Sequence, residues 1–483
     1  MKKSRLKALI MSLATTAVVS TSVQAAPPAM TRNAHVDWAK NAVIYEVNLR
    51  QGTPERNLKG MTAELPRLKA LGVDILWLMP IHPISEVNRK GTLGSYYAVA
   101  DYKAVNPEFG TFEDLKAFVA KAHELGMKVI IDEVCNHTGC DNAWVKTNPE
   151  FYAKNDKGEM FGPFDWTDTY KLDYSNPGLR KEMIDALKFW VREADIDGYR
   201  ADVAMEVPTD FWERLRQELL AIKPVFMLAE ASKPELTIAG FDADYNWPMK
   251  DLFNAISATM GENAYAKEHK QNLKKSTATD IDVLLAQQAN AYPADTYRMN
   301  MVTNHDLNSW EGTEFDRYGK SLGAFAVLSY TLPGMPMMYT GQEVGYRKAF
   351  EFFEHDETPD YTANEYTAFY KMLNSLKHTQ KALDAGITGG RMLRYGTTDT
   401  NIYAFTRQLP DSEVVVIANL SPKKTKLEFT GNNFAAAVPD GCSGADVKQG
   451  VPEFNGFTDW FGGCDAKLPA ELAPWQYFVL VRK

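Results

Sequence analysis

Short apolar runs alternate with longer amphipathic stretches from Val43 to about Gln380. Each run has the length of a β-strand, whereas the stretches between them repeat apolar residues with the period of a helix. Strands that alternate with helices form parallel sheets, and eight such repeats predict a closed (β/α)₈ TIM barrel. The eight predicted strands are residues 43–47, 75–79, 129–131, 198–203, 225–228, 243–245, 299–302 and 337–339.

Two segments depart from this pattern. Residues 138–173, after the third strand, show no clear helix and are rich in Asn, Asp, Trp, Gly and Pro. A long loop inside a compact domain usually has a function, so we expect a small excursion there. After Gly389 the pattern changes to the alternation of antiparallel strands, at residues 402–405, 414–417, 426–429 and 478–481. Residues 389–483 are therefore predicted to form a C-terminal β-sandwich domain, and residues 26–388 the barrel.

The first 25 residues have the pattern of a secretory signal peptide. A basic segment precedes an apolar run over residues 8–19, and Val23-Gln24-Ala25 gives a small-x-Ala cleavage pattern. The run is too short to span a bilayer. We therefore expect an exported protein, periplasmic or extracellular, whose mature chain begins near Ala26.

Charge and cysteine content limit the partners. The formal net charge of −9 argues against nucleic acid or an anionic membrane as the main partner. Export suits disulfide bonds, so Cys442 and Cys464 are predicted to pair. Cys135 and Cys140 either pair or remain buried thiols. The cysteine spacing does not resemble a zinc site.

Chemically active side chains follow several of the predicted strands. In a barrel, the carboxyl ends of the strands form the active site. One Asp after a strand is often only a helix N-cap, but several at one rim are hard to explain that way. Glycosidic cleavage needs one carboxyl group as an acid and a second as a nucleophile or base. The residues in question are Asp132, His137, Arg200, Asp202, Glu230, His305 and Asp306.

With these motifs in order, the chain resembles glycoside hydrolase family 13, the α-amylase family. The resemblance covers nearly all of the mature chain. It is carried by Asp132-Glu133-Val134-Cys135-Asn136-His137, Gly198-Tyr199-Arg200-Ala201-Asp202, Glu230, Asn304-His305-Asp306, the segment 72–80, Tyr97, and the segment 334–343.

The resemblance implies a role for each site residue. Asp202 would be the nucleophile, Glu230 the general acid/base and Asp306 a transition-state stabiliser. The sugar at the cleavage point would be bound by Tyr97, His137, Arg200 and His305. The resemblance also implies an α-glucan substrate and makes the excursion at residues 138–173 a domain B. A retaining enzyme of this kind holds its two carboxyl groups about 5–5.5 Å apart.

Three segments depart from the family pattern. Met205-Glu206 replaces a usual Lys-His pair, and Lys171 stands where calcium-binding members tend to carry Asp. We therefore expect no metal or other cofactor, with a Lys171–Glu206 ion pair in place of the calcium; alternatively, Lys171 points to solvent. Val203 follows the nucleophile where many α-1,4-specific members carry Ala, which leaves the linkage preference open.

The sequence favours a retaining hydrolase, acting as a monomer, that cleaves α-1,4 bonds of maltodextrins and soluble starch. A glucanotransferase of the same family and an α-1,6-acting oligosaccharide glucosidase remain alternatives. A non-catalytic glucan-binding protein is a further alternative, but it would have no reason to keep all three carboxylates.

Overall fold

Eight parallel strands close into a barrel in the part of the chain that the computed structural model describes, residues 35–261, 263, 267, 275–438 and 447–482. Their order around the barrel is β1-β10-β9-β8-β7-β6-β3-β2. Each predicted strand has a counterpart, so the predicted TIM barrel is confirmed. The strands are β1 (Ile44–Val47), β2 (Ile75–Leu78), β3 (Lys128–Glu133), β6 (Gly198–Ala201), β7 (Phe226–Ala229), β8 (Ala243–Tyr245), β9 (Tyr297–Asn300) and β10 (Met335–Tyr339).

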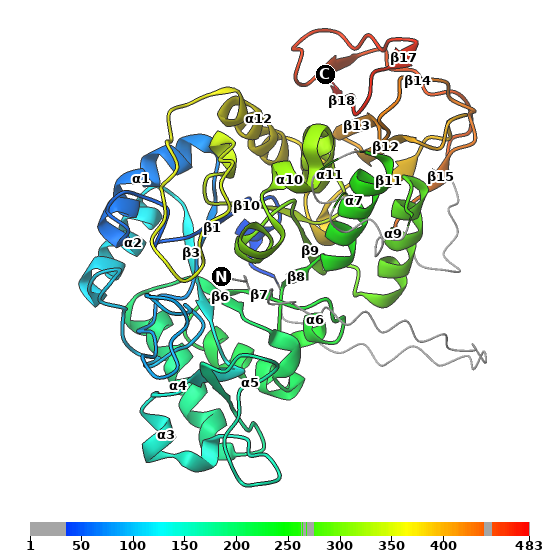
Figure 1. Ribbon diagram of the computed structural model, residues 1–483. Helices are drawn as coiled ribbons and strands as arrows, with labels where there is room; N and C mark the ends of the chain where they lie inside the picture. Colours follow the sequence, from blue (N-terminus) through cyan, green and yellow to red (C-terminus); the bar gives the residue numbers. More distant parts are fainter. Residues whose placement is uncertain (1–34, 262, 264–266, 268–274, 439–446, 483) are drawn as a thin grey trace, which may run out of the picture. The chain divides into compact units, whose positions relative to one another are not determined.

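Helices surround the barrel (Figure 1). Their ends follow local chemistry: the Thr111 side chain accepts a hydrogen bond from Asp114 N in a capping box, and Gly72, with φ of 98°, ends the first helix. The longer helices are α1 (Leu58–Leu71), α2 (Phe112–Glu124), α4 (Pro177–Glu193), α5 (Thr209–Leu220), α7 (Trp247–Met260), α9 (Thr279–Ala291), α11 (Leu322–Thr331) and α12 (Glu365–Thr379), and the short ones are α6 (Leu236–Ala239) and α10 (Glu314–Tyr318).

The period-2 alternation of the strands separates two apolar clusters. Ile75, Trp77 and Ile130 belong to a cluster inside the barrel, whereas Leu76 and Val129 pack in the larger cluster with the surrounding helices. Because alternate residues point to opposite faces of a strand, the side chains that follow an inward-facing residue by two also point inward. This rule brings the acidic residues at the strand ends toward a common centre.

Domain B lies between β3 and α4. Its antiparallel strands β4 (His137–Gly139) and β5 (Thr169–Lys171) pair with His137 opposite Lys171. The sequence showed no clear helix there, yet the structure has a single helical turn, α3 (Trp144–Thr147), and a 3₁₀ turn at Pro149–Phe151. A turn this short has too few residues to show a helical period.

The C-terminal region has a six-stranded antiparallel sheet with the order β15-β11-β12-β13-β18-β16, and a separate pair, β14 and β17. The predicted strand at residues 426–429 is largely wrong, because only Thr425–Lys426 is β14. Beyond it, the backbone turns to form an isolated bridge between Thr397 and Phe429. The strands are β11 (Arg391–Arg394), β12 (Ile402–Leu409), β13 (Ser412–Asn419), β14 (Thr425–Lys426), β15 (Phe434–Ala435), β16 (Phe457–Asp459), β17 (Glu471–Leu472) and β18 (Tyr477–Arg482).

Both faces of the six-stranded sheet are covered. Tyr403 and Val414 belong to the same apolar cluster as the barrel helices, whereas Ile402 and Val415 belong to a cluster within the C-terminal region. Polar contacts add to this packing. Arg394 Nε lies 2.9 Å from Asp282 Oδ1 of α9, and the Trp460 indole donates a hydrogen bond of 3.0 Å to the Met372 carbonyl of α12.

The cysteine alternatives are partly resolved. Cys135 and Cys140 are buried free thiols, so a bond between them is wrong. Cys135 is fully buried in the core, whereas Cys140 lies 3.6 Å from the Asn88 amide in domain B. Cys464 is an exposed free thiol in the structure, whereas Cys442 lies outside the described residues, so the bond between these two cysteines is not shown and stays a prediction. The predicted signal peptide also lies outside the described residues and stays a prediction. No helix in the described part of the chain is long and apolar enough to cross a membrane.

Candidate active site

One guanidinium group organises the acidic residues at the barrel mouth. Arg200, on β6, is fully buried. Its Nη1 donates to Asp132 Oδ1 at 2.8 Å and to Asp202 Oδ1 at 3.0 Å, while Nη2 forms an ion pair of 2.9 Å with Glu230 Oε2. Its Nε donates to the Tyr245 hydroxyl at 3.1 Å. Three carboxyl groups from three strands therefore meet at one buried cation.

Asp202 and Glu230 differ in how their oxygens are used. Glu230 Oε2 accepts a hydrogen bond of 2.7 Å from the backbone N–H of Val203 in addition to its contact with Arg200. Asp202 Oδ2 is buried and has no hydrogen-bond partner among the described residues. Glu230 thus has one hydrogen bond and one ion pair on a single oxygen, whereas Asp202 has an oxygen without a hydrogen-bond partner among the described residues. The spacing of about 5–5.5 Å between the two carboxyl groups stays a prediction.

Burial raises the pKa values of two carboxyl groups of this cluster, those of Asp202 and Asp132. Burial raises the pKa of Asp202 well above its ordinary value, and the Glu230 charge raises it further, whereas Arg200 lowers it. Burial also raises the pKa of Asp132 to about 6, against the opposing effect of Arg200. Because the groups interact, their titration steps belong to the cluster and not to single residues.

His305, which follows β9, has a charged environment and is linked to Asp132 through the Tyr97 hydroxyl. Its Nδ1 lies 2.5 Å from Glu46 Oε1, and its Nε2 lies 2.8 Å from the Tyr97 hydroxyl and 3.3 Å from Asp306 Oδ1. Burial opposes the charge, but Asp306 and Glu46 together raise the pKa of His305 to about 9. The imidazole is therefore a cation at neutral pH. The Asp306 side chain is 38% exposed and lies at the rim.

His137, unlike His305, is neutral. Burial lowers its pKa to about 3, so the ring is neutral. Its Nε2 is buried and without a hydrogen-bond partner in the described part of the chain. The Trp166 ring of domain B lies 5.2 Å from the His137 ring. An unpartnered ring nitrogen at this position can bond to a hydroxyl group of a bound molecule.

At the position where the resemblance implies calcium, an ammonium group faces a carboxylate. Lys171 Nζ lies 3.3 Å from Glu206 Oε2, with side chains 31% and 32% exposed, so the predicted ion pair is present and Lys171 does not simply point to solvent. Calcium needs several carboxylate and carbonyl oxygens, and an ammonium group there repels a cation. Among the described residues, no group of three or more His, Cys, Asp or Glu side chains could hold a metal ion.

The structure adds three residues that the sequence did not single out. Glu46 of β1 holds His305, Tyr245 of β8 holds Arg200, and Trp77 of β2 donates from Nε1 to Asp132 Oδ2 at 3.2 Å. All three are fully buried. The signal for Glu46 was a charged residue inside an otherwise apolar strand, which must have a partner. Its partner is 259 positions away in the sequence, so the alternation pattern alone could not identify it.

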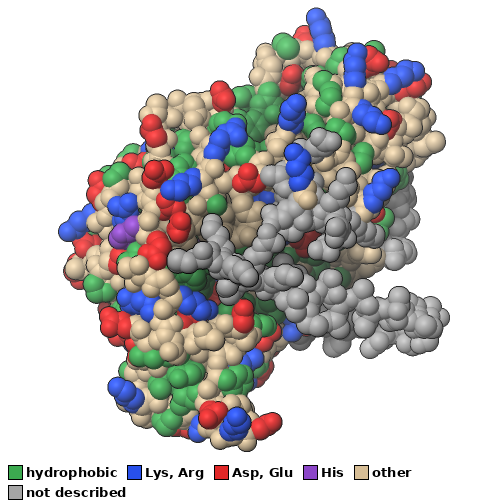
Figure 2. Space-filling view, viewed as in Figure 1, with side chains coloured by type: hydrophobic (Ala, Val, Ile, Leu, Met, Phe, Trp, Pro, Cys, Tyr) green, Lys and Arg blue, Asp and Glu red, His purple; other side chains and the backbone are tan. Residues whose placement is uncertain are grey.

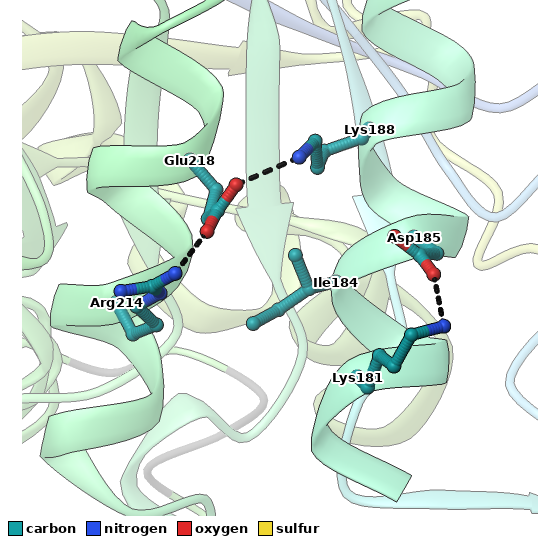
Figure 3. A pocket seen from close by; sticks show the side chains of 6 residues that line it. All are labelled: Lys181, Ile184, Asp185, Lys188, Arg214 and Glu218. Carbon is teal, nitrogen blue, oxygen red and sulfur yellow. Dashed lines mark hydrogen bonds and ion pairs between the residues drawn. The ribbon is translucent and has the colours of Figure 1, made fainter. Parts of the chain in front are cut away.

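A surface groove between α4 and α5 is separate from this cluster. It is lined by Lys181, Ile184, Asp185, Lys188, Arg214 and Glu218. Figure 3 shows that its charges are already paired, with Glu218 between Lys188 and Arg214, and Lys181 beside Asp185. On the face drawn in Figure 2, acidic and basic side chains are likewise interspersed. The groove therefore offers no unpaired charge to a ligand.

The comparisons with known proteins define the class of this protein. The alpha-amylase catalytic domain matches residues 43–170 and 148–381, which together include the whole barrel and domain B. The chain therefore belongs to the α-amylase family, and it is a glycoside hydrolase.

The sequence identity to individual relatives is low, but each match extends over most of this chain. Alpha-amylase 3 of Dictyoglomus thermophilum is 27% identical over 461 residues, which cover 81% of this chain and 87% of that protein. An oligo-1,6-glucosidase of Heyndrickxia coagulans is 26% identical over 396 residues, covering 66% of this chain and 69% of that protein. The crystal structure of the maltogenic alpha-amylase AmyB from Thermotoga neapolitana is similar with a TM-score of 0.74 at 26% identity, covering 92% of this chain and 98% of that one.

Proposed function

We propose that this protein is a retaining α-glucan hydrolase that cleaves α-1,4 bonds of maltodextrins and soluble starch through a covalent glycosyl-enzyme intermediate. The observation that carries the proposal is the placement of Asp202 and Glu230 on one buried guanidinium, with Asp202 Oδ2 left without a partner. A shared cation holds both groups at one site, as two-step displacement requires.

In the proposed reaction, Asp202 Oδ2 attacks the anomeric carbon while Glu230 gives its proton to the glycosidic oxygen, and the leaving sugar departs. Water then attacks the anomeric carbon of the resulting ester as Glu230 takes a proton from that water, which frees Asp202 and restores the α-configuration. The developing positive charge is stabilised by Asp306. The neutral ring of His137 and the charged ring of His305 bind sugar hydroxyls, Tyr97 stacks on the sugar, and Arg200 orients both carboxylates.

An α-1,6-acting glucosidase is the second candidate, because of Val203. This residue adopts a left-handed backbone, with φ of 35°, directly after the proposed nucleophile. A β-branched residue rarely adopts that conformation, and such strain is concentrated at functional sites. A branched side chain there changes the space for the leaving sugar. The relative named oligo-1,6-glucosidase supports the same alternative.

The experiment that decides between these functions is product analysis with maltoheptaose, pullulan, cyclodextrin and isomaltose as substrates, with and without an added sugar acceptor. Release of shorter maltooligosaccharides in water supports the hydrolase. Transfer products that dominate when an acceptor is present would support a glucanotransferase. A clear preference for isomaltose would make the enzyme an α-1,6-glucosidase.

Three further parts of the proposal rest on the sequence and on local contacts. Export to the periplasm or medium rests on the basic and apolar N-terminal segment. Independence from a metal cofactor rests on the Lys171–Glu206 pair. Binding of the substrate by the active site of a monomer is the third part, and on this basis soluble maltodextrins should be better substrates than granular starch.

A further inference from the structure

A large aromatic side chain is exposed directly beside the catalytic cluster. Trp310 is 49% exposed, although tryptophan is mostly buried on average. It lies on a short π-helix, Leu307–Glu311, that begins immediately after Asp306. π-Helical turns are rare in proteins, and those that do occur are often found at functional sites. No step of the proposed mechanism uses this residue.

Ring contacts connect Trp310 to the cleavage point. The Trp310 ring lies 5.4 Å from Phe352 and 5.9 Å from Phe353. Phe352 in turn lies 6.3 Å from Tyr97, with the two rings inclined by only 14°. Tyr97 is stacked on His305 at 5.5 Å. Tyr97, Phe352, Phe353 and Trp310 therefore form an aromatic strip that runs from the catalytic cluster to the exposed rim.

Polar contacts hold the outer end of this strip in place. Asn308 Oδ1 accepts a hydrogen bond of 2.9 Å from Phe350 N, which ties the π-helix to the loop that carries Phe352 and Phe353. Gln51 Nε2 donates to the carbonyls of Glu351 and Glu354, at 2.7 and 2.9 Å.

The buried Arg50 donates from Nη1 to the Phe352 carbonyl at 3.2 Å, and Leu93 N donates to the Phe353 carbonyl at 3.0 Å. The loop is thus fixed from three separate parts of the chain. A rigid surface binds a ligand without a large cost in conformational entropy.

The strand order places this strip on one particular side of the cleavage point. Glu230, the proposed acid that protonates the leaving group, follows β7, whereas Asp306 and Trp310 follow β9, with β8 between them. Tyr97 follows β2, which is reached from β9 through β10 and β1. The strip therefore lies away from the proposed acid, and thus away from the leaving group. It lies on the side of the substrate that stays attached to the enzyme after the first step.

We propose that Trp310, supported by Phe352 and Phe353, binds a glucose unit on the non-reducing side of the sugar at the cleavage point, so that this enzyme prefers longer maltooligosaccharides. A glucose ring has an apolar face of C–H groups, and that face buries apolar area against an exposed indole. The inference rests on the proposed function, because it assumes that the chain binds α-glucans in this cleft.

The test compares Trp310→Ala and Trp310→Phe with the matched control Phe434→Ala, an aromatic residue of the C-terminal sheet that is 44% exposed. The substrates are maltoheptaose and α-glucosyl fluoride, which is a single sugar and reaches only the cleavage point. In Trp310→Ala, the ratio of kcat/KM for maltoheptaose to that for glucosyl fluoride should fall roughly tenfold. Trp310→Phe should recover much of the loss, and Phe434→Ala should leave the ratio unchanged.

An unchanged ratio in Trp310→Ala, while the wild type hydrolyses both substrates, would overturn the inference and leave the proposed function standing. If the wild type hydrolyses neither substrate, the proposed function fails, and calorimetric titration of maltoheptaose into wild type and Trp310→Ala then decides the inference by itself. A Kd raised roughly tenfold by the substitution supports the binding role, and equal Kd values contradict it.

Discussion

The ammonium group of Lys171 lies 3.3 Å from the carboxylate of Glu206 and links strand β5 of domain B to the turn directly after Asp202. The pair lies at a position where calcium-binding relatives are expected to use a metal ion. Domain B is thereby tied to the catalytic strand by two side chains of the chain itself.

If this pair replaces the calcium, a chelator should leave the melting temperature unchanged. Lys171→Met and Glu206→Gln should each cost about 1 kcal/mol or less, since both side chains are one third exposed, and should lower the melting temperature by no more than about 2 °C. Thermal unfolding with and without chelator measures both effects. A large drop with chelator that calcium alone reverses would show that the metal is present after all.

Asp202→Asn should lower kcat on maltoheptaose by about 10⁴-fold or more, because it removes the proposed nucleophile. Maltoheptaose binding, measured by calorimetry, should stay close to that of the wild type. Asp411→Asn, at an exposed site of the C-terminal region, is the matched control and should keep full activity. Comparable turnover by Asp202→Asn would remove this residue from the mechanism.

The pKa values of the two histidines should be shifted in opposite directions from the ordinary value. His305, with a folded pKa of about 9 against an ordinary value of 6.5, contributes stability that is complete below about pH 6.5 and is lost as the pH rises through 9. His137, with a folded pKa of about 3, contributes stability that is complete above its ordinary value and is lost as the pH falls toward 3.

NMR titration of the imidazole signals measures both pKa values. In His305→Gln, the free energy of unfolding should fall less between about pH 6 and about pH 10 than it does in the wild type. A His305 signal that titrates near its ordinary value would contradict the role of Glu46 and Asp306.

Digestion of maltoheptaose should first release α-anomers, because two displacements restore the configuration. Proton NMR during the first turnovers distinguishes the anomers, and initial β-anomers would overturn the mechanism.

Val203→Ala should shift the ratio of the rates on maltotriose and isomaltose, since it removes the branched side chain next to Asp202. The same ratio in both proteins would show that Val203 does not set the linkage.

Cys135, Cys140 and Cys464 are free thiols in the structure. If the exported protein bonds Cys442 to Cys464, thiol counting on denatured, unreduced protein should find two free thiols, those of Cys135 and Cys140. Four free thiols would exclude the bond. The count after reduction, which should be four, serves as the control.

The barrel could be predicted because its strands are short apolar runs separated by amphipathic helices, and local patterns carry that information. The chemistry of the rim could be predicted because strand ends converge in a barrel. The residues that hold the rim in place could not be predicted. Glu46 contacts His305, and Gln51 bonds to the Glu351 carbonyl, only in the closed barrel, because these residues are far apart in the sequence. The strand predicted at residues 426–429 was too long, because an alternation of apolar residues indicates which side chains are buried and not which strands are hydrogen-bonded.

The C-terminal sheet has a consequence for how this enzyme can be engineered. Tyr403 and Val414 belong to the same apolar cluster as the barrel helices, and Arg394 pairs with Asp282 of α9. A cut at the start of this region would expose that apolar face to water and leave a buried charge without its partner. The region is therefore not an exchangeable module, and chimeras with other glycosidases have to carry the barrel helices and the sheet across together.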